Sequence, residues 1–178
     1  MPKRTNSPII AAILIAAAAF ALNGCSQSAN NKSETQVQPQ GTPSRSFTTA
    51  DIAKLKWIEG TWKGMDGDKP FFERYRFEGD SKMIVEGFAD ETLTTVSDTS
   101  VFEFKDGEFG HTDERGNRSA ASSITADAVQ FAPVGGSGNF YRFERQPGET
   151  WRAILEWPAQ NGKPARQKVY VMEPYKAP

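Results

Sequence analysis

The sequence predicts an all-β domain, an antiparallel up-and-down barrel of about 8–10 strands that follows a short helical turn. Short runs of aromatic and β-branched residues alternate with Gly-, Asn- and Asp-containing turn signals from residue 61 onward. No stretch of ten or more residues after Gly60 has the apolar spacing of an amphipathic helix. An open sheet with this many strands would leave two exposed edges, and closure into a barrel removes them.

The helical turn is expected between Thr48 and Gly60. Thr48 is followed three residues later by an acid, which is the pattern of a capping box at a helix start. Ile52 and Leu55 are three residues apart and therefore share one face of a helical turn. Gly60 is expected to end the turn, and residues 61–63 favour an extended backbone.

The remaining strands are separated by turn residues. Asp106-Gly107 is a strong signal for a two-residue hairpin, and residues 65–68 are expected to form another turn. The strands are expected at residues 71–78, 83–89, 99–105, 109–113, 118–125, 129–132, 140–146, 150–157 and 166–172.

Alternation within these strands predicts which side chains point inward. In residues 71–78 the inward set is Phe71, Glu73, Tyr75 and Phe77, which places a carboxylate among aromatic rings. A buried unpaired charge is costly, so Glu73 needs a partner. Candidates from later strands are Arg142, Arg152 and Arg166. Two further inward sets are Trp151, Ala153, Leu155 and Trp157, and Arg166, Lys168, Tyr170 and Met172.

The N-terminus has the features of an export signal. Lys3 and Arg4 precede an apolar run over residues 8–22, which is too short and too close to the N-terminus for a stable membrane span. Leu22-Asn23-Gly24-Cys25 follows and contains the chain's single cysteine, which cannot form an internal disulfide.

These residues resemble the lipobox of bacterial lipoproteins, with Asn23 less usual than a small residue at its position. The resemblance implies cleavage between Gly24 and Cys25 and lipid attachment to Cys25, so that acyl chains anchor the protein in a bilayer. Ser26, where an aspartate would retain such a protein in the inner membrane, favours the outer membrane and the periplasmic side. An ordinary signal peptide with an incidental cysteine is the alternative.

The chain therefore divides into three segments. Residues 1–24 are the expected signal peptide, and residues 25–49 a lipidated tether rich in Ser, Asn, Gln, Thr and Pro. Such a composition buries too little apolar surface to fold. Residues 50–178 are the expected barrel domain.

The start of this domain carries a family resemblance. Gly60-Thr61-Trp62 resembles the G-x-W opening of the calycin superfamily, which includes lipocalins and fatty-acid-binding proteins. The longer run Leu55-x-Trp57-Ile58-x-Gly60-x-Trp62 is similar to the start of an uncharacterised bacterial calycin-like family. The resemblance implies that Trp62 plugs one end of the barrel beneath the helical turn and that a late basic residue, Arg166 or Lys168, packs over it. Residues 131–136 depart from the family, because they lack its segment with His and Asp.

Composition and motifs argue against several classes of function. A net charge of −1 gives no basic footprint for nucleic acid. His111 is the sole histidine and no H-E-x-x-H motif or cysteine pair is present, so we expect no metal and no cofactor. A catalytic triad or a haem ligand would have to use His111, which we instead expect at the surface or the barrel rim. Residues 135–138 lack the residues of a phosphate-binding loop.

The resulting expectation is an envelope protein whose barrel binds a small apolar or amphipathic molecule. Aromatic walls would bury the ligand and one or two polar groups would orient it. The candidate contacts are Trp62, Glu73, Tyr75, Phe104, Trp151 and Tyr170. The alternative is a non-enzymatic interaction or envelope-maintenance module with a packed barrel. An enzyme that uses Glu73 as a general base is a third, less favoured interpretation. Nothing in the sequence indicates an oligomeric state.

Overall fold

The structure is a computed structural model that describes residues 46–135, 139–160 and 162–178. The expected signal peptide, the lipid-attachment residue Cys25 and nearly all of the expected tether lie outside the described residues.

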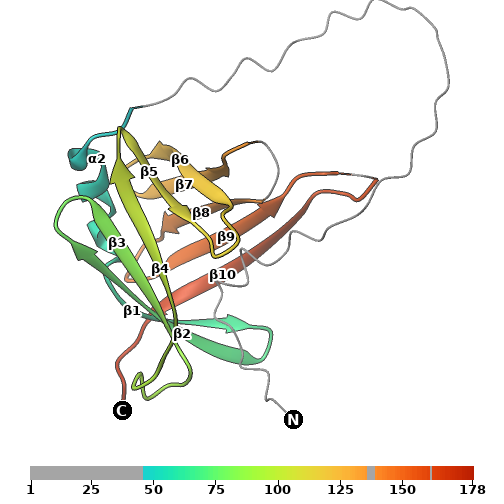
Figure 1. Cartoon of the computed structure of the whole chain (residues 1–178). Coiled ribbons are helices and arrows are strands. Elements are labelled where there is room, and N and C mark those ends of the chain that lie inside the picture. Colours follow the sequence, from blue (N-terminus) through green and yellow to red (C-terminus); the bar gives the residue numbers. More distant parts are fainter. Residues whose placement is uncertain (1–45, 136–138, 161) are drawn as a thin grey trace, which may run out of the picture.

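The domain is a closed, ten-stranded, antiparallel up-and-down barrel (Figure 1). Every strand pairs with the next one in the chain, and β1 pairs with β10 to close the barrel. This arrangement confirms the predicted fold class. The elements are α2 (Thr49–Ala53), η1 (Lys54–Ile58), β1 (Gly60–Asp66), β2 (Lys69–Glu78), β3 (Lys82–Phe88), β4 (Val96–Lys105), β5 (Glu108–Thr112), β6 (Arg118–Ile124), β7 (Ala128–Pro133), β8 (Phe140–Arg145), β9 (Trp151–Trp157) and β10 (Arg166–Pro174).

The β4–β5 hairpin confirms the clearest turn signal of the sequence. Asp106 and Gly107 both have positive φ, at 54° and 81°, as a type I′ turn requires. The β1–β2 hairpin is tighter than predicted, because the ladder continues to the pair Asp66 and Lys69 and leaves only two residues in the turn.

The helical turn begins with the predicted capping box. The Thr48 side chain and the Asp51 side chain each bond the other residue's backbone N–H. Phe47 precedes the cap, is buried, and donates its N–H to the Gly107 carbonyl at 2.7 Å. Phe47 and Ile52 are both buried at the two positions of a hydrophobic staple. The domain therefore starts at about residue 47, a few residues before the predicted boundary at 50, because an apolar residue fixes the entry to the helix.

The helical segment lies at one end of the barrel (Figure 1). Trp62 is buried there, and its indole N–H donates to the Ile58 carbonyl at 2.8 Å, so η1 is tied to the ring beneath it. We call this the helix end. Because the strands alternate in direction, the connections β1–β2, β3–β4, β5–β6, β7–β8 and β9–β10 all lie at the opposite end, which we call the far end.

Trp151 is the centre of the packing at the helix end. It is fully buried, and its ring lies 5.2–6.3 Å, between ring centroids, from four other aromatic rings. These belong to Trp57, Trp62, Tyr75 and Phe143. Each contact is edge-on, the arrangement that aromatic quadrupoles favour.

Candidate functional site

Most of the buried polar side chains of the barrel interior come from β4, β5, β6 and β8 and lie beside the aromatic core. Toward the helix end the inward side chains are apolar or aromatic, and they include Trp62, Trp151, Phe143, Val129, Phe109 and Met83. Toward the far end apolar inward side chains such as Leu155 continue, and the polar ones among them are Asp98, Ser100, His111, Ser119 and Tyr141. We call these five residues, together with Glu73, the polar cluster. Four of the five lie near the far end of their strands, and Ser100 lies in the middle of β4.

Glu73 points into the barrel, as the alternation predicts, and its side chain is only 2% exposed. The hydroxyl of Tyr75 donates to its Oε2 at 2.8 Å. The expected arginine partners lie elsewhere. Arg142 and Arg152 point outward and both bond Glu144, at 2.8 and 3.2 Å. They lie at positions of β8 and β9 whose side chains face outward, so their long charged side chains stay in contact with water.

Asp98 adds a second carboxylate on the same interior level. Gly87 pairs with Glu73 on one side and with Asp98 on the other. Since Gly87 has no side chain, nothing from β3 separates the two acids, whose backbones are roughly 9–10 Å apart at two strand spacings. Burial raises the pKa of Asp98 above its usual range, and nearby Glu114 acts in the same direction. Burial, Glu73 and Asp98 together raise the pKa of Tyr75 well above its usual value.

His111 lies inside the barrel, so its predicted position at the surface or rim is wrong. It is 6% exposed, and its ring packs against Phe102 with centroids 5.1 Å apart. The ring nitrogen Nδ1 is 3.0 Å from the Val101 carbonyl oxygen. A carbonyl only accepts, so Nδ1 carries the proton of the neutral ring and Nε2 presents a lone pair. Nε2 is buried without a hydrogen-bond partner among the described residues.

We predict that His111 makes the barrel less stable in mild acid. Burial lowers its pKa below the usual value of 6.5. Below pH 6.5 the unfolded chain therefore binds a proton at His111 that the folded chain does not bind. As the pH decreases from 6.5 to the pKa of the folded state, the free energy of unfolding decreases. Urea titrations from pH 7 downward should show this slope in the native protein and a flatter profile in His111→Gln.

Because the chain has one histidine, the imidazole nitrogen signals in an NMR spectrum belong to His111 and need no assignment. We expect a protonated Nδ1 and a titration below pH 6.5. A protonated Nε2 in the neutral ring, or a pKa at or above 6.5, would contradict the geometry described above.

Tyr141 supplies the polar cluster with a hydroxyl. Its side chain is 3% exposed and stacks on Phe131 with ring centroids 4.7 Å apart. The hydroxyl lies near Ser119 but makes no hydrogen bond of good geometry among the described residues. Burial raises its pKa well above the usual range, so the hydroxyl keeps its proton and can donate or accept.

The candidate contacts from the sequence fall into two groups. Trp62, Tyr75 and Trp151 belong to one aromatic cluster at the helix end. Phe104 and Tyr170 lie apart from that cluster. Phe104 is partly buried near the helix end of β4, and Tyr170 packs edge-on against Phe71 with centroids 5.6 Å apart. Of the six candidates, only Glu73 and Tyr75 place polar atoms inside the barrel near Asp98.

The predicted pairing of Trp62 with Arg166 or Lys168 is wrong. On β10, Trp62 pairs with Pro174, whereas Arg166 and Lys168 begin that strand at the far end. Arg166 lies over Trp157 at 4.4 Å. Lys168 bonds Asp66 at 2.6 Å and lies over Tyr170. Six to eight residues of extended strand, roughly 20–27 Å, separate these cations from Trp62 along the barrel.

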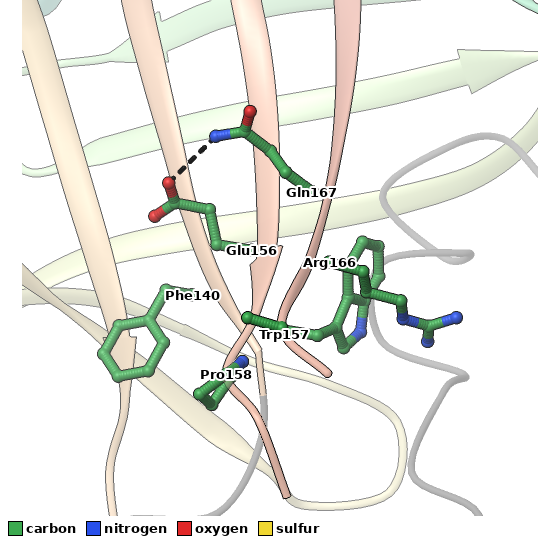
Figure 2. Close-up of a pocket in the computed structure, with 7 residues that line it drawn as sticks. Phe140, Glu156, Trp157, Pro158, Arg166 and Gln167 are labelled. Carbon is green, nitrogen blue, oxygen red and sulfur yellow. Dashed lines mark hydrogen bonds between the residues drawn. The ribbon is translucent and has the colours of Figure 1, made fainter. Parts of the chain in front are cut away.

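A surface hollow lies at the far end of β9 and β10. It is an open pocket of about 510 Å³ around Trp157 and Arg166 (Figure 2). Glu156 and Gln167 are joined there by a 3.0 Å hydrogen bond. The lining residues are Phe140, Glu156, Trp157, Pro158, Ala165, Arg166 and Gln167. Three of them, Phe140, Glu156 and Gln167, have the outward parity of their strands, so this pocket is distinct from the polar cluster.

Asp98, Ser100, Ser119 and Tyr141 belong to the site but were not predicted from the sequence. Alternation was the available signal, because each has the same parity as a buried aromatic or a partly buried alanine on its strand. Within residues 46–135, 139–160 and 162–178, no group of three or more His, Cys, Asp or Glu side chains is placed to hold a metal ion. No helix in these ranges is long and apolar enough to cross a membrane.

Comparison of the chain with protein-family models, with curated proteins and with solved structures finds no match. The interpretation of the site therefore depends on its own chemistry and on the resemblance of the opening run.

Proposed function

We propose that the protein is a lipid-anchored envelope lipoprotein, most consistent with the outer membrane and its periplasmic side, whose calycin-like barrel binds one small amphipathic molecule. The observation that carries the proposal is a group of buried polar atoms beside the aromatic core that have no hydrogen-bond partner among the described residues. Rings at the helix end offer an apolar surface, and the polar cluster toward the far end holds buried polar atoms, His111 Nε2 and Asp98 Oδ1, that lack hydrogen-bond partners in the described chain.

Such an interior favours a molecule with two unlike ends. Buried polar groups without partners are costly, and a ligand that supplies those partners stabilises the protein. Ring contacts extend without a break from Trp151 through Phe143 and Phe131 to Tyr141. A ligand that enters from the far end would meet polar groups and aromatic rings together, and it would be held by apolar burial and oriented by hydrogen bonds.

We predict that the protein isolated gently from its own host carries a bound small molecule. The protein to be expressed in the host and measured is the chain from Ser26 onward. It retains every described residue and lacks only the expected signal peptide and acylation site. Native mass spectrometry should show a reproducible extra mass that disappears on denaturation. A clean mass, with no rise in melting temperature when a host lipid extract is added, would contradict the proposal, because a ligand that binds only the folded state must stabilise it.

A packed interaction module is the second candidate. It is favoured by the continuous ring packing and by two exposed valines on the outer face of β10, Val169 at 44% and Val171 at 51% exposure. Such a module should cross-link to one specific envelope protein through β10. Exchange of both valines for threonine should then abolish the cross-link while the barrel stays folded.

A further inference from the structure

We propose that the ligand head group is a hydrogen-bond donor with positive charge, an amine on an apolar body, rather than a carboxylate. This inference rests on the proposed function, since it names the chemical class that the polar cluster would select. It follows from the inventory of donors, acceptors and charges inside the barrel.

The interior presents acceptors. His111 donates through Nδ1 to the Val101 carbonyl, so its buried Nε2 can only accept from a partner. Asp98 Oδ1 is also buried and has no hydrogen-bond partner among the described residues, while the Gly87 N–H and the Ser97 side chain interact with the same carboxylate. The Tyr75 hydroxyl already donates its hydrogen bond to Glu73 Oε2. The hydroxyls of Ser100, Ser119 and Tyr141 can act in either sense.

The charges inside have one sign. The buried charged side chains of the described chain are Glu73 and Asp113, and Asp98 is half-buried. No lysine or arginine of the described ranges is among the buried residues. Arg166 and Lys168 are exposed at the far end and are engaged by Trp157 and by Asp66. A carboxylate ligand would thus meet other carboxylates, whereas an ammonium group would meet opposite charge.

The aromatic rings add to the same preference. Phe102, Phe131 and Tyr141 pack against one another and line the interior next to His111. The faces of such rings attract cations, by about 0.5–2 kcal/mol in measured cases. An amine head group beside Asp98 and His111 would therefore be held by a carboxylate, an imidazole lone pair and ring faces, while its apolar body contacts the remaining rings.

The test compares three ligands that share one chain, decylamine, decanol and decanoate, each below its micelle concentration. The protein is the chain from Ser26 onward, and binding is measured by calorimetry and thermal melting at pH 7. We expect decylamine to bind one to one and about tenfold or more tighter than decanol, with decanoate weakest, since charge-assisted hydrogen bonds exceed neutral ones by this margin. Decylamine should also move the single His111 Nε2 resonance.

The matched variants are Asp98→Asn and Asp80→Asn. Asp80 is exposed in the β2–β3 turn at the helix end, so its change tests surface adsorption of an amine. Asp98→Asn should weaken decylamine about tenfold and leave decanol within about twofold, whereas Asp80→Asn should change neither. Circular dichroism and the His111 resonance check that both variants fold.

The outcomes separate the two proposals. If decanoate binds as tightly as decylamine, the amine inference is overturned, but the proposal that the barrel binds an amphipathic molecule stands. The amine inference is also overturned if Asp98→Asn and Asp80→Asn weaken decylamine equally, or if neither variant weakens it. In both cases the amine is not held by Asp98. No binding by any of the three, together with a clean native mass, overturns the proposed function and the amine inference with it.

Discussion

Replacement of Trp151 by alanine is expected to lower the free energy of unfolding by about 3–5 kcal/mol, the range for loss of a large aromatic from a packed core. The side chain is fully buried and four rings pack around it. One of these rings belongs to Trp62, which is hydrogen-bonded to η1, so the cavity would also loosen the attachment of the helical segment. Since domains of this size have only about 5–15 kcal/mol in total, much of the stability would be lost.

Trp157→Ala is the matched control for this prediction. Trp157 lies on the same strand and has the same inward parity, six residues further along, but it is only partly buried and packs under Arg166 at the far end. We expect its loss to cost no more than about 1–2 kcal/mol. Urea unfolding followed by tryptophan fluorescence and circular dichroism measures both variants. Equal losses would mean that Trp151 is not the centre of the packing.

Local sequence signals predicted much of the fold because local chemistry decides those features. The capping box at Thr48 depends on two side chains three residues apart. The Asp106-Gly107 turn depends on two residues that tolerate positive φ. Strand parity, which placed Glu73 and Tyr75 inside, follows from the period of the extended chain. None of these features requires knowledge of which strands pair.

Positions along the barrel axis could not be predicted in the same way. Parity correctly put Arg166 and Trp62 on inward faces, but their separation depends on the register between the first and last strands. That register is a property of the closed barrel and its strand tilt, and no local pattern encodes it.

The burial of His111 was indicated by strand alternation, but the neighbouring glycine suggested an exposed position. Phe109 and His111 share one parity, and Phe109 is completely buried. Between them, Gly110 packs so closely on β6 that an added Cβ would lie 2.5 Å from the Ser119 carbonyl oxygen. A glycine beside a polar residue suggested a rim, whereas here it permits close strand contact and leaves the neighbouring histidine inside.

The polar cluster was hard to foresee because its members come from five strands. Asp98, Ser100 and Ser119 are residue types that are usually exposed, and each lies in a strand that reads as partly solvated. Only the closure of the barrel turns these separate inward positions into one site. The functional interpretation therefore depends more on the structure than the fold prediction did.

Replacement of Cys25 by serine is expected to abolish lipid attachment entirely, because the thiol is the atom that would carry the acyl group. Cells grown with a labelled fatty acid should place the label on the native protein and none on Cys25→Ser. Intact mass should show that the native protein starts at Cys25 and that the variant retains residues 1–24. Membrane fractionation alone is a poor measure here, since an uncleaved apolar segment over residues 8–22 can hold the variant at the membrane.

The adjacent Ser26→Ala variant is the control, since it leaves the expected acylation site intact and should keep both the label and the cleavage. Loss of label in both variants would point to a general export defect, and label retained in Cys25→Ser would exclude this cysteine as the anchor. The prediction bears on ligand binding as well as on location. Acyl chains contribute about 0.8 kcal/mol for each buried methylene, so a lipidated barrel would stay beside the bilayer, where amphipathic molecules concentrate. The Cys25→Ser variant should fold and bind decylamine as the native domain does, because the change lies outside the barrel and removes only the acyl chains.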